Sequence, residues 1–325
     1  MRCAMSSCLM SGILMLSPMA AGAAQNECRQ DATPIVSFVQ FQSPNLQAPT
    51  TPLTIKGKLT LPVNADANQR CFNARRNVPA VVILHGSSGV DSRGDFYAQG
   101  LNAAGIATLE IDMWEARGVV GASGRPPLPL FNYPDAFSAL AFLRAHPNIA
   151  SERIGVLGFS WGGVVSVASA EQLYAATFGG GSNGPRFKAH VAHYPTCYVF
   201  NKTDWPPTAP VPPPAKAGTQ FLNLTGAPVL IQIGTEDDYD NGAGPCRSLA
   251  DSVNPSNNNV VDVAVYEGAY HAWDRIMIPI RVFDPFGDLG SFFQTGVVPP
   301  VEIRADVDAA YAARQRVVSF FRSQL

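Results

Sequence analysis

The chain has 325 residues, 46% of them hydrophobic, and its 23 Lys and Arg nearly balance 25 Asp and Glu for a net charge of -2. A chain of this size and apolar content can bury one large core. The balanced charge excludes the strongly basic surface that binds nucleic acid or anionic membranes. We therefore expect one large domain whose partner is a small molecule of little charge.

Residues 1–23 have the pattern of a secretory signal peptide. Arg2 provides the only charge, Leu9 to Met19 is a short apolar stretch, and Ala21-Gly22-Ala23 is a small-x-small cleavage site. An uncleaved membrane anchor is the less favoured alternative, because the apolar stretch is too short to span a bilayer comfortably. We predict a secreted or periplasmic protein with no membrane anchoring after cleavage, and a single domain over 24–325.

Four cysteines remain after signal removal, namely Cys28, Cys71, Cys197 and Cys246. An even number in an oxidising compartment favours two disulfides. We predict the pairs Cys28–Cys71 and Cys197–Cys246, since each would staple a loop-rich region, with free buried thiols as the alternative. None of the four has metal-ligand spacing with a histidine, so we expect no metal.

The first predicted strand covers Thr54 to Leu61, where apolar and polar residues alternate with a period of two. This pattern indicates a strand with one wet face, and we expect an antiparallel edge strand. The later strands are continuous apolar runs, typical of strands covered on both faces. They are Ala80 to Leu84, Ile106 to Ile111, Ile154 to Leu157, Pro228 to Ile233 and Val260 to Tyr266.

Helical patterns lie between these strands. Apolar residues recur at helical spacing from Ala136 to Leu143, with Pro134 near the start, where its missing N–H costs little. A C-terminal helix contains Ala310, Ala313 and Val317. The alternation predicts an α/β fold, a mostly parallel sheet sandwiched between two layers of helices.

Two stretches do not fit the alternation. Trp205 to Pro214 is rich in proline and should be extended, and Asp284 to Pro300 is rich in Gly, Pro and Phe. Each is either a substrate-facing loop or structural padding. Gly179 to Gly184 matches a nucleotide-binding glycine pattern, but Pro185 follows it where a helix should begin, so we expect a loop and no cofactor.

The most informative motif is Gly158-Phe159-Ser160-Trp161-Gly162, which follows the apolar run Ile154 to Leu157 and precedes small residues. A Gly-x-Ser-x-Gly turn between a strand and a helix exposes the serine hydroxyl on a strained backbone. Ser160 is therefore our candidate nucleophile. The alternative is an ordinary glycine-rich strand-to-helix turn.

A serine hydroxyl needs a base to become nucleophilic, and the chain has five histidines. His271 is the best candidate, because it follows the strand that ends near Tyr266. His146 sits at a helix end, where a cation suits the helix dipole. His190 and His193 would lie on opposite faces of a strand, and we interpret them as packed core histidines.

A carboxylate must orient the imidazole. The strand Pro228 to Ile233 runs into Gly234-Thr235-Glu236-Asp237-Asp238, at the same edge of a parallel sheet as Ser160. We predict Asp237, with Asp238 as the close rival and helix capping as the structural alternative. The chain order serine, aspartate, histidine is the one expected for this topology.

A tetrahedral oxyanion requires backbone N–H donors. Trp161, directly after the nucleophile, supplies the first. The second should come from the loop His85-Gly86-Ser87-Ser88-Gly89 after the strand Ala80 to Leu84, and we favour the N–H of Ser87. His85 would then position this loop.

These motifs together resemble the dienelactone hydrolase family of the α/β-hydrolase superfamily. The resemblance rests on residues 85–89, 158–163, 234–238 with Pro245-Cys246, and 266–274, and covers most of the chain from about residue 50. It implies an eight-stranded sheet and a metal-free triad of Ser160, Asp237 and His271. The family's namesake enzymes have a cysteine at the position of Ser160, whereas serine is typical of broader esterases.

The sequence therefore predicts a secreted serine hydrolase that cleaves small carboxylic esters or lactones through an acyl-enzyme. A peptidase with the same machinery and a non-catalytic binding protein on the same scaffold are the alternatives. Five aromatic or basic side chains could line the pocket, although aromatic residues more often simply pack in the core or at the rim. That set is Phe96, Trp114, Arg117, Tyr198 and Trp205.

Overall fold

A computed structural model describes residues 34–62, 77–201 and 223–325. The predicted signal peptide, Cys28, Cys71 and the stretch Trp205 to Pro214 lie outside the described residues. Within the described ranges, no helix combines the length and apolarity needed to cross a membrane.

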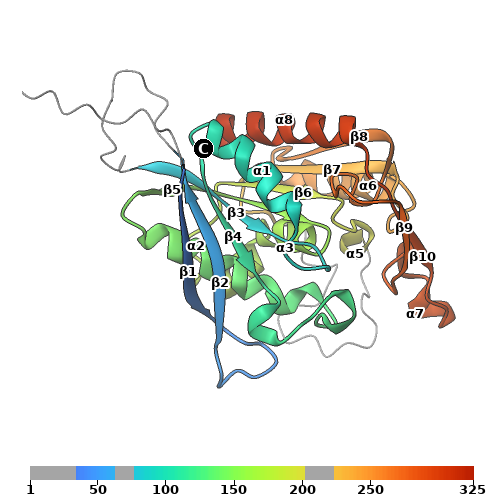
Figure 1. Ribbon diagram of the computed structural model, residues 1–325, viewed down its shortest axis with the longest axis horizontal. Helices are drawn as coiled ribbons and strands as arrows, with labels where there is room; N and C mark the ends of the chain where they lie inside the picture. The colour runs from blue at the N-terminus through green and yellow to red at the C-terminus, as the bar shows by residue number, and fades with distance from the viewer. Residues whose placement is uncertain (1–33, 63–76, 202–222) are drawn as a thin grey trace, which may run out of the picture.

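Eight strands form one sheet in the order β1-β2-β4-β3-β5-β6-β7-β8 (Figure 1). The pairs β1–β2 and β2–β4 are antiparallel, and the pairs from β4 through β3 to β8 are all parallel. The α/β class, with a mostly parallel eight-stranded sheet, is thus confirmed. The strands are β1 Ile35–Ser43, β2 Leu53–Leu61, β3 Val78–Leu84, β4 Ala107–Asp112, β5 Ile149–Phe159, β6 Ala189–His193, β7 Val229–Glu236 and β8 Val261–Tyr270.

Helices cover both faces of this sheet (Figure 1). One face packs against α1 and α8, and the other against α2, α3, α4 and α6. The helices are α1 Ser92–Ala103, α2 Tyr133–Ala145, α3 Trp161–Ser169, α4 Gln172–Phe178, α5 Tyr198–Asn201, α6 Gly244–Val253, α7 Phe292–Thr295 and α8 Val307–Gln324. Short 3-10 turns occupy Glu115–Arg117, Ala122–Gly124, Pro129–Asn132, Asn254–Ser256 and Asp288–Gly290.

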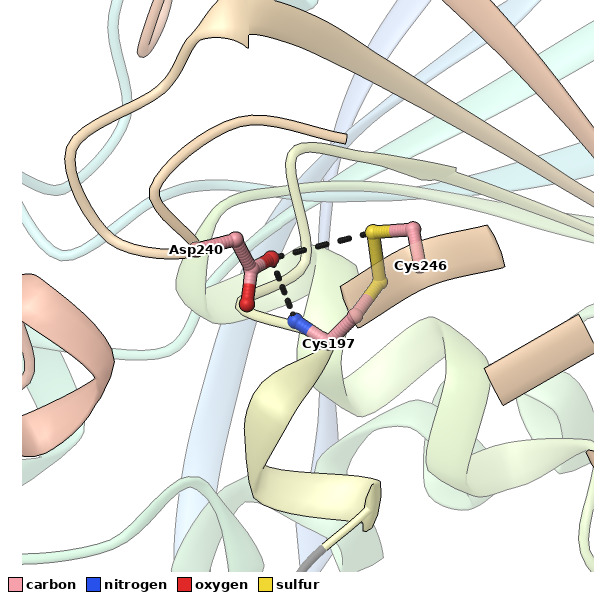
Figure 2. Close-up of side chains that lie close together, drawn as sticks. All are labelled: Cys197, Asp240 and Cys246. Atoms are coloured by element: carbon pink, nitrogen blue, oxygen red, sulfur yellow. Dashed lines mark hydrogen bonds between the residues drawn. A yellow bond between two sulfur atoms is a disulfide. The ribbon is translucent and has the colours of Figure 1, made fainter. Parts of the chain in front are cut away.

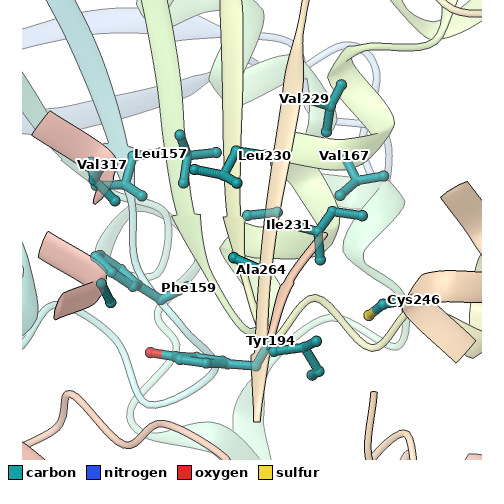
Figure 3. Close-up of a cluster of buried hydrophobic side chains, with 14 of the residues drawn as sticks. Leu157, Phe159, Val167, Tyr194, Val229, Leu230, Ile231, Cys246, Ala264 and Val317 are labelled. Carbon is teal, nitrogen blue, oxygen red and sulfur yellow. The ribbon is translucent and has the colours of Figure 1, made fainter. Parts of the chain in front are cut away.

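The continuous apolar strands are buried on both faces. Leu157 of β5 and Leu230 of β7 pack with Val317 of α8 in one cluster, as Figure 3 shows. Each such side chain has 0 to 2% of its surface exposed. Burial of one aliphatic side chain contributes roughly 1.5–3 kcal/mol, so this layer fixes the sheet on which the site is built.

The prediction of an edge strand over Thr54 to Leu61 is wrong in one respect. That segment is the antiparallel β2, but β1 pairs with its outer side and forms the edge. β1 was missed because its apolar residues do not alternate cleanly; Val36 and Phe38 are 53% and 87% exposed. Pairing with β2 and packing of Val39 and Phe41 against the core hold β1 in place.

The segment between β8 and α8 contains structure that the sequence did not predict. β9 (Ile280–Phe283) pairs with β10 (Pro300–Ile303) in a small antiparallel sheet, and α7 lies between them. We call residues 280–303 the insert. It forms a separate unit at one end of the molecule, and it includes the predicted irregular stretch Asp284 to Pro300 (Figure 1).

The predicted disulfide Cys197–Cys246 is present and is fully buried, with its two Cα atoms 5.0 Å apart. It joins the turn after β6 to α6. Asp240 lies beside it and accepts a hydrogen bond from the backbone N–H of Cys197 at 2.6 Å (Figure 2). It also accepts one from the backbone N–H of Tyr198 at 2.8 Å. The same two segments are therefore tied by a covalent bond and by a buried carboxylate.

Candidate active site

The turn that carries Ser160 is as sharp as the motif predicts. Ser160 has φ 51° and ψ -110° between the end of β5 and the start of α3. A Cβ on Gly158 would lie 1.9 Å from the backbone oxygen of Gly162, and one on Gly162 would lie 2.3 Å from that of Leu84. Only glycine fits these two positions. The strained serine is held by its N–H, which donates to the backbone oxygen of His193 at 2.9 Å.

Three distant residues converge at this turn. Nε2 of His271 lies 2.9 Å from Oγ of Ser160, and Nδ1 of His271 lies 2.8 Å from Oδ2 of Asp237. The exposed fractions are 9% for Ser160, 2% for His271 and 1% for Asp237. A proton on Nδ1 donates to the carboxylate and leaves Nε2 free to accept from the hydroxyl. This is the arrangement that general-base activation of a serine requires.

The neighbouring Asp238 faces away from the imidazole. Its Oδ2 accepts a hydrogen bond from the N–H of Glu302 at 2.7 Å, and its backbone oxygen accepts one from Asp288, also at 2.7 Å. Asp237 instead uses Oδ1 to accept the N–H of Tyr239 at 2.9 Å, which fixes the carboxylate plane. Of the two adjacent acids, the geometry joins Asp237 to His271.

Aromatic rings hold the imidazole of His271 on two sides. The ring of Tyr239 lies 4.2 Å and that of Tyr194 lies 4.7 Å from it, measured between centroids. Tyr194 in turn donates its hydroxyl to Asp274 at 2.5 Å and accepts from Arg93 at 3.1 Å. Burial alone would raise the pKa of Asp274, but its contacts with His193, Arg93 and Tyr194 lower it, so the carboxylate stays charged.

The two predicted oxyanion donors come from the start of α3 and from the loop after β3. The N–H of Trp161 is the first amide of α3, where a helix leaves its N–H groups unpaired. Ser87 sits in the tight turn closed by Gly89 N–H to Gly86 oxygen at 3.0 Å, and it lines the same cavity as Ser160. Its backbone oxygen accepts from the indole of Trp114 at 3.0 Å, which orients this peptide.

His85 fixes this loop and is uncharged. Its Nδ1–H donates to the backbone oxygen of Gly86 at 2.7 Å, and its Nε2 accepts the N–H of Met113 at 2.9 Å. Burial lowers the pKa of His85 to about 4. The contacts agree with the predicted positioning role and leave His85 unsuited to act as a base for Ser160.

The side chains of His190 and His193 make their hydrogen bonds to groups other than the Ser160 hydroxyl. Burial lowers the pKa of His190 to about 4, and its Nδ1–H donates to the backbone of Ser166 at 3.1 Å. His193 is fully buried and accepts from the amide of Gln232 at 2.9 Å. His146 follows the last residue of α2. Among the described residues, the cluster with metal-ligand composition is the pair Cys197 and Cys246 with Asp240, and the disulfide removes both thiolates.

A cavity of about 950 Å³ opens onto Ser160 and His271. Among the described residues, four of the five side chains suggested for the pocket do not line it. Phe96 packs against the guanidinium of Arg314, and the ring of Trp114 meets that of His85 edge to face. Arg117 pairs with Asp135 at 2.8 Å, and the hydroxyl of Tyr198 donates to the backbone oxygen of Phe286. Trp205 lies outside the described residues. For Phe96, Trp114, Arg117 and Tyr198, the structure thus favours the packing alternative.

Sequence reasoning missed the residues that do build the cavity wall. Arg125 donates to Asp284 at 2.7 Å, and the hydroxyl of Tyr239 donates to the same carboxylate at 3.0 Å. Phe286 follows in the insert, with its ring 5.4 Å from the guanidinium of Arg125. The partners are 159 residues apart in the chain, so no local pattern joins them. The concentration of Phe and Pro after Asp284 was the available signal.

A model of the dienelactone hydrolase family matches residues 132–325, which include the serine turn, both acids and His271. The chain belongs to the dienelactone hydrolase family. This confirms the family and superfamily that the motifs resemble. The enzyme class expected with it, that of carboxylic-ester hydrolases, agrees with this membership.

Individual relatives are more distant. An "uncharacterized peptidase YtmA" of Bacillus subtilis is 38% identical over 64 residues, 19% of this chain, and the matched part is only 25% of that relative's length. A Bradyrhizobium protein, a "probable 2-oxo-3-(5-oxofuran-2-ylidene)propanoate lactonase", is 22% identical over 206 residues, 60% of this chain and 73% of its own.

Among solved structures, a thermophilic esterase of the planctomycete Thermogutta terrifontis, described with propionate bound, has a similar fold. The TM-score is 0.55 at 15% identity, and the match covers 87% of this chain and 93% of that one. At this identity the likeness extends to the fold alone. It supports the mostly parallel sheet described above.

Proposed function

We propose that this member of the family is a serine hydrolase that cleaves carboxylic esters or lactones through an acyl-enzyme. The observation that carries the proposal is the continuous hydrogen-bonded series Ser160–His271–Asp237, with 2.9 Å and 2.8 Å between the heavy atoms. In this proposal the backbone N–H groups of Trp161, which follows the nucleophile, and of Ser87, which lines the same cavity, supply the charge stabilisation that such chemistry needs.

The reaction has two halves. Oγ of Ser160 attacks the ester carbonyl carbon while Nε2 of His271 takes the hydroxyl proton, and the oxyanion forms between the two N–H donors. Collapse breaks the bond to the alcohol oxygen, which receives the proton from His271 and leaves. Water then attacks the acyl-serine with His271 as base, and the products are the free acid and the restored Ser160. Asp237 remains charged and stabilises the imidazolium throughout.

The decisive test combines labelling with kinetics. A fluorophosphonate should label the folded wild type once, at Ser160, and Ser160→Ala should lose both labelling and at least about 10⁴-fold of the ester hydrolysis rate. Ser151→Ala, at a half-buried position near the start of β5, is the matched serine control and should keep both. Undiminished hydrolysis by Ser160→Ala would refute the proposal.

A peptidase is the second candidate, because the Bacillus relative carries that name. The same acyl transfer would then release an amine instead of an alcohol. A panel of peptidyl p-nitroanilides beside p-nitrophenyl esters and a lactone separates the two candidates. We expect turnover of the esters and lactone and none of the anilides; efficient anilide cleavage that depends on Ser160 would favour the peptidase.

The N-terminal segment completes the proposal. We infer that residues 1–23 are removed on export and that residues 24–325 act as a single catalytic domain in an oxidising compartment. The buried Cys197–Cys246 bond supports such a compartment. N-terminal sequencing of exported protein should begin near Ala24, and an intact N-terminus on active, exported protein would contradict this.

A further inference from the structure

The insert contributes the apolar side of the cavity that opens onto Ser160. The main body provides the polar side, with the Gly86–Ser88 turn and His271 among its lining residues. The insert adds a run of hydrophobic and aromatic side chains. They include Ile280, Val282, Phe286, Phe292, Phe293 and Val298. The cavity is thus divided into a reacting end and an apolar end.

The only ionisable side chain among the described insert residues that line the cavity is Asp284, and its charge is already matched. Oδ1 accepts from Arg125 at 2.7 Å and from the N–H of Phe286 at 3.0 Å, and Oδ2 accepts from Tyr239 at 3.0 Å. The side chain of Asp284 is 8% exposed and that of Arg125 is 11% exposed. The insert therefore presents little free charge to a bound molecule.

The Arg125–Asp284 ion pair joins the insert to the body next to the nucleophile. The guanidinium of Arg125 lies 5.2 Å from the ring of Trp161 and 5.4 Å from that of Phe286. Trp161 directly follows Ser160 and carries one of the two oxyanion donors. The guanidinium thus sits between an aromatic ring of the body and one of the insert, which fixes the distance between the two walls.

The insert is also hydrogen-bonded to the loop that carries the triad acid. The N–H of Leu289 donates to the backbone of Tyr239 at 3.0 Å, and those of Asp288 and Glu302 donate to Asp238 at 2.7 Å. Asn241 donates its side-chain amide to Asp288 at 2.8 Å. With this many attachments, the insert forms a fixed wall of the site.

The volume of the cavity also favours a substrate with a bulky apolar group. A cavity of about 950 Å³ is near the upper end of the roughly 300–1,000 Å³ that encloses drug-sized ligands. A short-chain ester would leave the apolar end unfilled. An uncharged aromatic or bulky aliphatic group would bury apolar surface there and stack against Phe286 and its neighbours.

We propose that the insert is the specificity-determining wall of this esterase: its apolar side chains bind a bulky, aromatic group of the ester, and the Arg125–Asp284 ion pair holds that wall at the site. The inference rests on the proposed hydrolysis at Ser160. It adds a substrate class to that function, since the ester link lies at the polar end and the aromatic group at the apolar end.

The test measures selectivity within two pairs of substrates that differ in one group. p-Nitrophenyl 3-phenylpropionate and p-nitrophenyl acetate share a leaving group, and benzyl acetate and ethyl acetate share an acyl group. The ratio of kcat/KM, aromatic over small, is the readout for each pair. In at least one pair, the wild type should prefer the aromatic ester by about tenfold or more.

Neighbouring valines give a matched pair of variants. Val298 lines the cavity, whereas Val297 is 69% exposed and does not. Phe286→Ala should lower the selectivity ratio by about tenfold and Val298→Ala by a smaller factor. Val297→Ala should leave the ratio unchanged. Phe286→Leu keeps most of the packing volume and serves if the alanine variant does not fold.

The ion pair is tested by Asp284→Asn, Arg125→Met and the double variant. Each single change should lower the selectivity ratio. The double variant should lower the ratio by a smaller factor than the product of the two single effects, because both substitutions remove the same interaction. A wild-type ratio near one in both pairs, or an unchanged ratio in Phe286→Ala and Phe286→Leu, would overturn the inference. Failure of the proposed function is a different result, namely hydrolysis of all four esters that persists in Ser160→Ala.

Discussion

Replacing both Cys197 and Cys246 with alanine tests how the disulfide stabilises the protein. The bond closes a loop with a sequence separation of 49 residues. In the chain-entropy model, a loop of that length is worth about 4 kcal/mol, because the cross-link restricts the unfolded chain. In the native state, Asp240 holds the same two segments by hydrogen bonds of 2.6 and 2.8 Å, so the loop carrying Asp237 should keep its place. We therefore expect a large loss of stability with little loss of activity.

The measurement is urea unfolding followed by tryptophan fluorescence, together with ester hydrolysis without denaturant. The free energy of unfolding should fall by about 4 kcal/mol, and kcat should stay within about threefold of the wild type. A Cys28→Ala/Cys71→Ala variant is the control, since it retains the Cys197–Cys246 bond and should still be destabilised by a reductant. A stability loss below about 1 kcal/mol, or a folded variant without activity, would refute this reasoning.

Three further predictions concern buried positions. Gly162→Ala would place a Cβ 2.3 Å from a backbone oxygen of β3 and should abolish ester hydrolysis, whereas Gly244→Ala meets no atom within 4 Å and should be harmless in the same assay. Asp135→Ala leaves the buried guanidinium of Arg117 unpaired and should cost about 3–5 kcal/mol in urea unfolding, most of it recovered when Arg117→Met is added. Burial and a neighbouring carboxylate raise the pKa of Asp240 from 3.8 to about 8, so the native state binds its proton more tightly than the unfolded chain. Its contribution to stability is full below about pH 4 and declines toward pH 8, by up to about 1.4 kcal/mol per pH unit; urea titrations from pH 5 to 8 should show that Asp240→Asn lacks this decline.

The central sheet was predictable because its signals are local. Runs such as Ala80 to Leu84 are apolar throughout and became β3, and the strand before Ser160 became β5 with its ends extended. The glycines around Ser160 indicate a sharp turn, because Gly158 and Gly162 have no room for a Cβ. The positions of Asp237 and His271 followed from the rule that parallel strands end at one edge of the sheet. The sequence left Asp237 and Asp238 open, because two adjacent side chains differ only in direction.

The cavity wall was not predictable, because it depends on contacts between distant segments. Arg125 and Asp284 are ordinary loop residues until the fold brings them together. Trp114 and Arg117 have the side chains that a pocket would use. In the structure the aromatic ring of Trp114 packs against His85, and the guanidinium of Arg117 pairs with Asp135. Composition identifies the kinds of side chain that a site uses, whereas the tertiary structure decides which copies are used.

The pairing of Ile280 with Ile303 has an evolutionary consequence. Because these two residues are partners across neighbouring strands, the chain leaves the hydrolase body and returns to it at nearly the same point. A short reverse turn could bridge that gap, so the insert can be replaced by another segment without a change in the catalytic sheet. New substrate preferences could thus be acquired by grafting a different module onto an unchanged reaction centre.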